Sequence, residues 1–289
     1  MFTVAPISSV IHDEHHLYMF ELRKEQSMSA KPTVLVTGAS SGIGATYADR
    51  LARRGHDLVL VARNKDRLAA LADKLRHETG VAIDILPADL ADSGERAAVE
   101  ARLRDDARIG ILVNNAGTSL GGAFVAQASD EVERLITLNS SALARLASAA
   151  APRMAAAGEG AIINIGSVVG LAPEFGAPVY GATKAFVLHF SQALALQLAP
   201  QGVYVQAVLP AATRTEIWQH SGVDVNTLEN VMEVGDLVDA ALAGFDRREG
   251  VTIPPLHDVA KWAAFEAARQ AMLPGFSEGR PASRYLPTA

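Results

Sequence analysis

The sequence predicts an α/β protein whose parallel sheet is doubly wound, with helices on both faces. Short apolar runs rich in Val, Leu and Ile alternate with longer helical patterns from Thr33 onward. Such alternation is typical of strands joined by right-handed helical crossovers, and continuous apolar strands indicate a sheet buried on both faces. A chain of 289 residues with 49% hydrophobic content can bury one substantial core, so we expect a single large domain.

Most expected strands are followed by a turn and a helix. The strands are expected in the run that starts at Thr33 and at residues 58–62, 81–86, 109–114, 161–165, 203–209 and 251–256. The helices are expected just after the first turn and at residues 65–78, 93–105, 130–156, 180–198 and 258–272. Ligands of such sheets bind at the carboxyl ends of the strands, so polar residues after each strand are the candidates for a site.

Composition excludes several classes of function. The formal net charge of -6 and the pI near 5.8 argue against a nucleic-acid partner. The absence of cysteine excludes disulfides and thiolate chemistry. The apolar runs are too short and too interrupted to span a bilayer, so we expect a cytoplasmic protein with no membrane partner.

Residues 1–31 show no clear periodicity and are expected to form a flexible extension. The α/β domain is expected at 32–256, followed by a helix and tail at 257–289. Three histidines in the extension could be metal ligands or a solvated cluster without function, and we favour the second interpretation: His12, His15 and His16. We therefore expect no metal site.

The first strand runs into a glycine-rich turn and then a helix. Its glycines, Gly38, Gly42 and Gly44, have the spacing G-x-x-x-G-x-G. Strand, glycine turn and helix point backbone N–H groups at a phosphate, and the missing Cβ atoms permit close approach. The residues between the glycines complete the expected phosphate-binding set: Ser40, Ser41 and Ile43.

The residues after the second and third strands indicate which nucleotide binds. Where an NAD-binding sheet usually has an acid for the ribose 2′-hydroxyl, this chain has Ala62 followed by Arg63 and Asn64. A guanidinium can pair with a 2′-phosphate, which predicts NADP(H); the alternative is a solvated surface arginine. Asp89 and Leu90 follow the third strand, and the carboxylate could accept from an adenine amino group or cap the next helix.

Further polar residues follow the fourth and fifth strands. Asn115, Ala116 and Gly117 suit a loop that touches a ring closely. Asn139 lies inside a long helical pattern, where asparagine is unfavourable, although an exposed helical position would also explain it. Ser167 presents a hydroxyl at the carboxyl edge of the fifth strand.

Tyr180 and Lys184 open the next helix with an i, i+4 spacing that places the phenol and the ammonium on one face. A free tyrosine has a pKa of about 10, and lowering it by about 3 units requires about 4 kcal/mol. A cation about 4 Å away at an effective dielectric of about 20 supplies on the order of 4 kcal/mol. We therefore expect Lys184 to lower the pKa of Tyr180; the alternative is an ordinary surface pair.

Together these motifs resemble those of the short-chain dehydrogenases/reductases. The matching motifs are the glycine loop at 37–44, the Asn-Asn-Ala-Gly sequence at 114–117, and Tyr180-x-x-x-Lys184. The resemblance covers roughly residues 32–215 and implies a Rossmann-type sheet of about seven strands. It also implies a catalytic tetrad of Asn139, Ser167, Tyr180 and Lys184.

The resemblance implies a role for each member of the tetrad. Tyr180 is the general acid in reduction and the base in oxidation, while Ser167 holds the substrate oxygen. Lys184 lowers the pKa of Tyr180 and binds the nicotinamide ribose. Asn139 positions a water through its main-chain carbonyl.

One departure from the family pattern follows the sixth strand. The family has Pro-Gly there, whereas this chain has Pro210-Ala211, and the loss of glycine restricts the backbone if a positive φ is required. Thr213 and Thr215, beside Pro210, are the candidates for contact with the nicotinamide amide. A substrate lid is expected at about 211–233, where Trp218 could line the pocket or be a buried anchor.

The remaining expectations from the resemblance concern the pocket and assembly. His220 is a second candidate for the lid, and residues 173–175 should form the opposite wall. A homodimer or homotetramer is expected through the long helices that contain Asn139 and Tyr180. We therefore predict an NADP(H)-dependent oxidoreductase acting on a carbonyl or secondary alcohol of a small molecule. The alternative, a non-catalytic nucleotide-binding sensor or scaffold, has no need of Tyr180 and Lys184 together.

Overall fold

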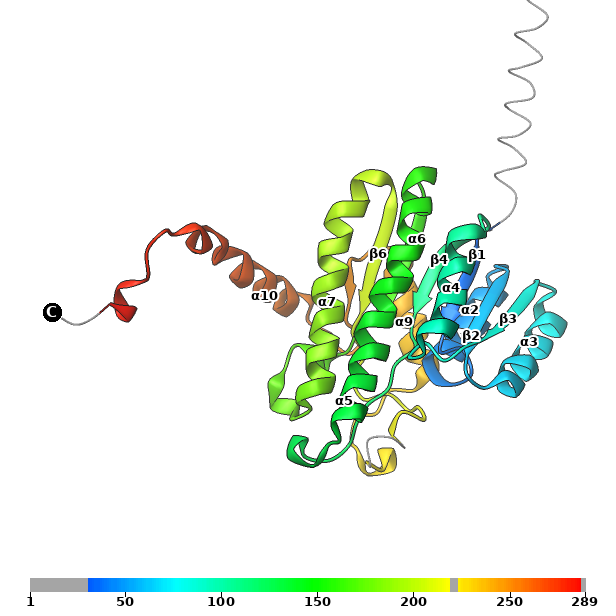
Figure 1. Cartoon of the computed structure of the whole chain (residues 1–289), viewed down its shortest axis with the longest axis horizontal. Coiled ribbons are helices and arrows are strands. Elements are labelled where there is room, and N and C mark those ends of the chain that lie inside the picture. Colours follow the sequence, from blue (N-terminus) through cyan, green and yellow to red (C-terminus); the bar gives the residue numbers. More distant parts are fainter. Residues whose placement is uncertain (1–30, 219–222, 287–289) are drawn as a thin grey trace, which may run out of the picture. The chain divides into compact units, whose positions relative to one another are not determined.

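The computed structural model describes residues 31–218 and 223–286 and contains a seven-stranded sheet in the order β3-β2-β1-β4-β5-β6-β7. Every neighbouring pair of strands is parallel. Helices cover both faces of this sheet (Figure 1). The doubly wound α/β fold predicted from the alternating pattern is therefore confirmed.

The elements follow the expected order along the chain. The strands are β1 (Thr33–Thr37), β2 (Leu58–Ala62), β3 (Ile83–Pro87), β4 (Ile109–Asn114), β5 (Gly160–Ile165), β6 (Val203–Val208) and β7 (Val251–Thr252). The helices are α2 (Gly42–Arg53), α3 (Lys65–Thr79), α4 (Ser93–Asp105), α5 (Ser129–Ile136), α6 (Leu143–Ala157), α7 (Pro178–Leu198), α9 (Val234–Asp246) and α10 (Val259–Ala271).

Alternate residues of the central strands enter two different hydrophobic cores. Val34 and Val36 of β1 pack with residues of α2, α3 and α9, whereas Leu35 packs with residues of α4, α6 and α7. Because both faces are buried, β1 appears in the sequence as a continuous apolar run. The strand order reverses between β1 and β4, so their carboxyl ends flank the crevice in which such sheets bind ligands.

Two expected elements differ from the structure by more than two residues at an end or by an interruption. The helix expected at 130–156 is divided into α5, a π-helical turn at Thr137–Ala142, and α6. The last strand ends at Thr252 rather than at residue 256. Pro254 and Pro255, which follow it, have no N–H to donate to the sheet.

The chain divides into two compact units after Ile253. The second unit contains α10, none of whose residues is buried.

Among the described helices, none combines the length and hydropathy that a membrane crossing requires. Within the same residues, no group of three His, Cys, Asp or Glu could hold a metal ion. The histidines considered as ligands lie outside the described residues: His12, His15 and His16.

Candidate active site

The turn after β1 has the geometry of a phosphate cradle. Gly38 and Gly42 have φ angles of 65° and 52°, in the left-handed region that favours glycine. A Cβ atom on Gly44 would lie 2.3 Å from the carbonyl oxygen of Gly38, so a larger residue would push α2 away from β1. We call Gly38, Gly42 and Gly44 the glycine cradle.

The N-terminus of α2 adjoins the glycine cradle without a side-chain cap. Ser41 precedes the helix in an extended conformation and makes no capping hydrogen bond, and no acidic residue lies in the first turn. The first N–H groups of a helix have no intrahelical partner and carry partial positive charge. These donors and the space left by the glycines fit the pyrophosphate of a dinucleotide, flanked by Ser40 and Ile43.

The loop after β4 is tied to the glycine cradle through Thr37, a residue to which the sequence argument assigned no role. The Thr37 hydroxyl accepts from the N–H groups of Asn115 and Ala116, at 2.9 and 3.0 Å. The Asn115 side chain donates to the carbonyls of Thr37 and Gly38, at 2.9 and 3.2 Å. The two loops at the switch point therefore form one connected assembly.

Arg63 and Asn64 lie after β2 and differ in their partners. The Asn64 side chain caps α3 by accepting from the N–H of Arg67 at 3.0 Å. Arg63 is exposed and forms no hydrogen bond or ion pair with any residue that the structure describes. Leu90, expected near the cofactor, has its side chain buried in the core beneath α4. Of these three side chains, the Arg63 guanidinium is the one available to a ligand.

The Asp89 carboxylate after β3 already has protein partners. Arg134 of α5 donates to its Oδ2 at 2.5 Å, and the N–H of Ala91 donates to its Oδ1 at 3.0 Å. Burial tends to raise the pKa of Asp89, but the hydrogen bond from Arg134 and the nearby charge of Arg63 outweigh burial and lower the pKa. The cap of α4, considered as an alternative role for Asp89, belongs to Asp92.

Ser167, Tyr180 and Lys184 meet at the carboxyl edge of β5, and we call them the proton-transfer corner. The single hydroxyl proton of Ser167 can be donated to the carbonyl of Pro210, 3.3 Å away, or to the phenol of Tyr180. Lys184 is only 6% exposed. Its Nζ donates to the carbonyl of Ile165 at 2.9 Å and lies 5.6 Å from the centre of the Tyr180 ring.

Burial shifts the pKa values of this corner away from the expected direction. It raises the pKa of Tyr180 to about 12, against an opposing contribution from the hydrogen bond with Ser167. It also lowers the pKa of Lys184 to about 8. Attraction between the two groups favours the charged form of each, whereas withdrawal from water disfavours it. By itself, this arrangement therefore raises the pKa of Tyr180, whereas a lowering was expected.

Asn139 lies in the π-helical turn and is 2% exposed, which contradicts the alternative of an exposed helical position. Its Oδ1 accepts from the N–H of Thr118 and its Nδ2 donates to the Thr118 carbonyl, both at 2.9 Å. Nδ2 also donates to the hydroxyl of Thr183 at 3.2 Å. The side chain thus joins the loop after β4 to the start of α7.

The alanine that replaces the family glycine after β6 does not require an unusual backbone. Among the described residues other than glycine, a positive φ occurs only at Asn230 and Arg248, so Ala211 has an ordinary one. Thr213 is buried and its hydroxyl donates to the carbonyl of Ala211 at 3.0 Å. Thr215 lies against the glycine cradle, because a Cβ atom on Gly42 would lie 3.2 Å from its methyl carbon.

Trp218 is tied to the base of the expected lid. Its indole N–H donates to the carbonyl of Thr213 at 2.7 Å, which favours the anchor interpretation over a substrate contact. A parallel bridge between Thr213 and Met232 joins the two ends of the lid. On the expected opposite wall, Phe175 is 63% exposed. His220 lies outside the described residues.

A buried chain of polar side chains, which the sequence argument missed, links β4, β5 and α7. Asn114 donates to Asn164 at 3.0 Å, and Asn164 donates to Ser191 at 2.9 Å. Asn164 interrupts the apolar run of β5, and this single polar residue is the signal by which the chain could have been found.

Comparisons with known proteins find similarity to dehydrogenases and reductases. The sequence profile described as short chain dehydrogenase matches residues 32–226. A short-chain dehydrogenase from Sphingobium yanoikuyae, solved in complex with NADPH, is 65% identical, with a TM-score of 0.87 over 88% of this chain and 100% of its own. The bulky-bulky ketone specific alcohol dehydrogenase from Comamonas testosteroni is 56% identical, with a TM-score of 0.84 over 90% of this chain and 100% of its own. A very-long-chain 3-oxoacyl-CoA reductase from Podospora anserina is 37% identical over 61% of this chain, which spans only 53% of that reductase.

Proposed function

Because the chain belongs to the short-chain dehydrogenase/reductase family, we propose that it is an NADP(H)-dependent oxidoreductase acting on carbonyl groups and secondary alcohols. The observation that carries the proposal is the meeting of Ser167, Tyr180 and Lys184 at the sheet edge that also holds the glycine cradle. A sensor would need the cradle but not a phenol beside a buried ammonium.

The residues of the crevice fit NADP(H). The glycine cradle and the uncapped end of α2 would hold the pyrophosphate, and Arg63 would pair with the 2′-phosphate. The similar Sphingobium yanoikuyae protein was solved with NADPH. When bound, this cofactor supplies or accepts the hydride, and the protein supplies orientation and proton transfer.

In the direction of reduction, the substrate carbon accepts hydride while Tyr180 donates its phenolic proton to the carbonyl oxygen, which gives the alcohol. The raised pKa of Tyr180 keeps this proton in place at neutral pH until negative charge develops on the oxygen. Ser167 donates its hydroxyl proton toward the same oxygen. The Lys184 ammonium, one helical turn away, stabilises the phenolate that remains on Tyr180. Oxidation follows the same steps in reverse.

The loops around this corner favour an uncharged, bulky ketone as substrate. Residues 116–128, 167–179 and 211–233 contain no lysine and one arginine, Arg214. Its guanidinium is already bonded to Glu233 at 2.8 Å and Asn226 at 2.9 Å. An acyl-CoA brings phosphates that require free cations. The same loops expose Phe124 and Phe175, and the similar Comamonas testosteroni enzyme is specific for bulky-bulky ketones.

NADPH oxidation measured against a panel of carbonyl compounds tests the proposal. We expect turnover of a ketone with two bulky apolar substituents and none of a 3-oxoacyl-CoA. Tight NADPH binding without turnover of any ketone, aldehyde or quinone would support the sensor alternative instead.

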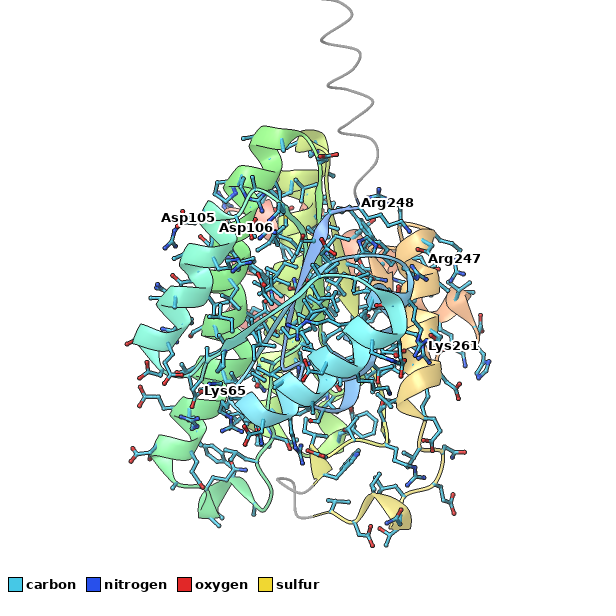
Figure 2. All side chains as sticks on the ribbon, turned by 90° about the vertical axis from the view of Figure 1, so that its right-hand side faces the viewer. Lys65, Asp105, Asp106, Arg247, Arg248 and Lys261 are labelled. Atoms are coloured by element: carbon cyan, nitrogen blue, oxygen red, sulfur yellow. The ribbon has the colours of Figure 1, made fainter. Side chains whose placement is uncertain are left out.

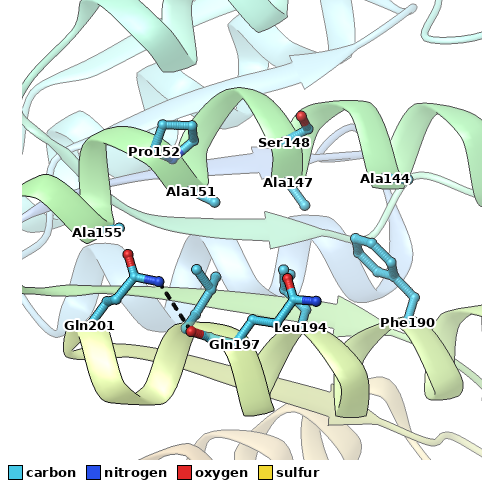
Figure 3. Close-up of a pocket in the computed structure, with 11 residues that line it drawn as sticks. Ala144, Ala147, Ser148, Ala151, Pro152, Ala155, Phe190, Leu194, Gln197 and Gln201 are labelled. Carbon is cyan, nitrogen blue, oxygen red and sulfur yellow. Dashed lines mark hydrogen bonds between the residues drawn. The ribbon is translucent and has the colours of Figure 1, made fainter.

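We also propose that the protein is a homo-oligomer assembled through α6 and α7. A groove of about 310 Å³ lies between these helices (Figure 3). Its lining is apolar or uncharged: Ala144, Ala147, Ser148, Ala151, Pro152, Ala155, Phe190, Leu194, Gln197, Leu198 and Gln201. Small side chains on α6 permit a second helix pair to approach closely. Light scattering during gel filtration tests the oligomeric state, with a monomeric mass as the contrary result.

The expected cytoplasmic location of the protein stays a prediction.

A further inference from the structure

Thr183 connects two members of the catalytic tetrad. It lies in the first turns of α7, between Tyr180 and Lys184, and is 3% exposed. Its hydroxyl accepts from Asn139 Nδ2 at 3.2 Å and donates to the carbonyl of Tyr180 at 2.7 Å. We propose that Thr183 is a positioning residue. Its hydroxyl holds the backbone of Tyr180 in a fixed position relative to Asn139, and this fixes the position of the Tyr180 phenol. This inference rests on the proposed function.

The direction of every hydrogen bond in this arrangement is determined. Asn139 Nδ2 has two N–H bonds, of which one is donated to the Thr118 carbonyl and the other to Thr183. Because the amide nitrogen has no acceptor capacity, Thr183 must accept from it. The single hydroxyl proton of Thr183 is therefore the one donated to the carbonyl of Tyr180. Neither Asn139 nor Thr183 has a donor left for a substrate.

The bonds connect three elements that position the reaction. Thr118 belongs to the loop after β4, Asn139 to the π-helical turn, and Thr183 to α7. Gly117, which precedes Thr118, lies close to both Asn139 and Lys184. A Cβ atom on it would be 3.2 Å from Asn139 Oδ1 and 3.7 Å from Lys184 Nζ. A shift of the α7 start would therefore move the phenol relative to the loop that lies beside Lys184.

A threonine bonded to its own helix is common and by itself would be an ordinary local contact. The distinguishing feature of Thr183 is that its hydroxyl joins two members of the tetrad, because it accepts from Asn139 and donates to the backbone carbonyl of Tyr180. Ser191 on the same helix provides a matched comparison, because it donates to the carbonyl of Val187 at 2.7 Å and accepts from Asn164 at 2.9 Å. Ser191 is equally buried but lies about two turns beyond Lys184.

The test compares Thr183→Val, Thr183→Ser and Ser191→Ala in the full-length protein. Misplacement of a catalytic group by about 1 Å can cost about 100-fold in rate, so we expect Thr183→Val to lower kcat by about 10- to 100-fold. The dissociation constant of NADPH should stay within about threefold, and Thr183→Ser should restore most of kcat. Ser191→Ala should lower the melting temperature with little change in kcat. If the valine variant does not fold, Thr183→Ala compared with Thr183→Ser makes the same distinction.

A second measurement does not depend on turnover. Tyrosinate absorbance is followed in the cofactor-free protein up to the highest pH at which circular dichroism shows the fold intact, and the Tyr180 signal is obtained by subtracting the curve of the Tyr180→Phe variant. Thr183→Val should shift the titration of Tyr180, whereas Ser191→Ala should not. Equal kinetic losses in the Thr183→Val and Ser191→Ala variants, or an unshifted titration in Thr183→Val, would overturn the inference. If the unmodified protein turns over no carbonyl compound, the proposed function fails, but the titration still decides the role of Thr183.

Discussion

The glycine cradle and the proton-transfer corner lie on the same edge of one sheet but hold their polar groups differently. At the cradle, the donors are backbone N–H groups of an uncapped helix, and the nearby Arg63 makes no hydrogen bond or ion pair with the described residues. At the corner, Lys184 and Ser167 are buried and bonded to backbone carbonyls.

This difference indicates which quantity each region controls. Donors without protein partners gain their bonds only when a ligand arrives, so the cradle side should determine cofactor affinity. Groups already held by the fold are preorganised for a developing charge, so the corner should determine rate.

The largest effect is expected for Tyr180→Phe. General acid catalysis contributes about 100- to 10,000-fold, so kcat should fall by about 1,000-fold when the phenolic proton is removed. NADPH affinity, measured by fluorescence titration, should change by less than about threefold. A variant that kept its turnover rate would remove Tyr180 from the proposed chemistry.

Gly44→Ala should distort the glycine cradle and weaken NADPH binding, without changing the proton-transfer corner. Its Cβ atom would lie 2.3 Å from the Gly38 carbonyl oxygen, so α2 must move. Such overpacking costs about 1–3 kcal/mol, and we expect NADPH affinity to weaken by up to about 100-fold in calorimetry. Gly235→Ala is the matched control, because its Cβ atom meets only the end of the Arg50 side chain, at 3.3 Å. Loss of kcat at saturating NADPH would contradict the division.

Arg63→Ala should affect one cofactor and not the other. Loss of a charged partner for the 2′-phosphate should weaken NADPH binding by about tenfold and leave NADH binding unchanged. The effect should shrink as salt is added, because the site is exposed. Lys65→Ala, a nearby cation labelled in Figure 2, is the control. Equal losses for NADPH and NADH would remove the NADP(H) assignment.

The smallest effect is expected far from both regions, at the end of α4. Asp106, labelled in Figure 2, accepts from Arg108 at 2.7 Å, and this hydrogen bond lowers the pKa of Asp106 to about 2. Because the folded pKa lies below the unfolded value of about 3.9, the stabilisation is present above about pH 4 and is lost as the pH falls toward about 2.

Asp106→Asn should therefore lower the free energy of unfolding at pH 7 by about 1 kcal/mol, after allowance for screening by water. Urea denaturation at several pH values measures this. The neighbouring Asp105→Asn serves as the control and should have little effect. A difference between Asp106→Asn and the parent that stayed constant from pH 7 down to pH 2 would contradict the assignment to Asp106.

The fold class and the family could be predicted from the sequence because their signals are local. The strand, the glycine turn and the helix follow one another within one short stretch, so their pattern is visible without knowledge of distant contacts. The same holds for Tyr180 and Lys184, which one helical turn brings to the same face.

The structure decided what depends on residues far apart in the chain. Asp89 is paired with Arg134, 45 positions away, and Asn139 with Thr183, 44 positions away. No local pattern contains such pairs, because packing of separate elements creates them. The pKa values of Tyr180 and Lys184 also depend on the packing of separate elements, because burial shifts both. The sequence determined by itself that a phenol and an ammonium share a helix face, but only burial in the folded protein determined which protonation state each prefers.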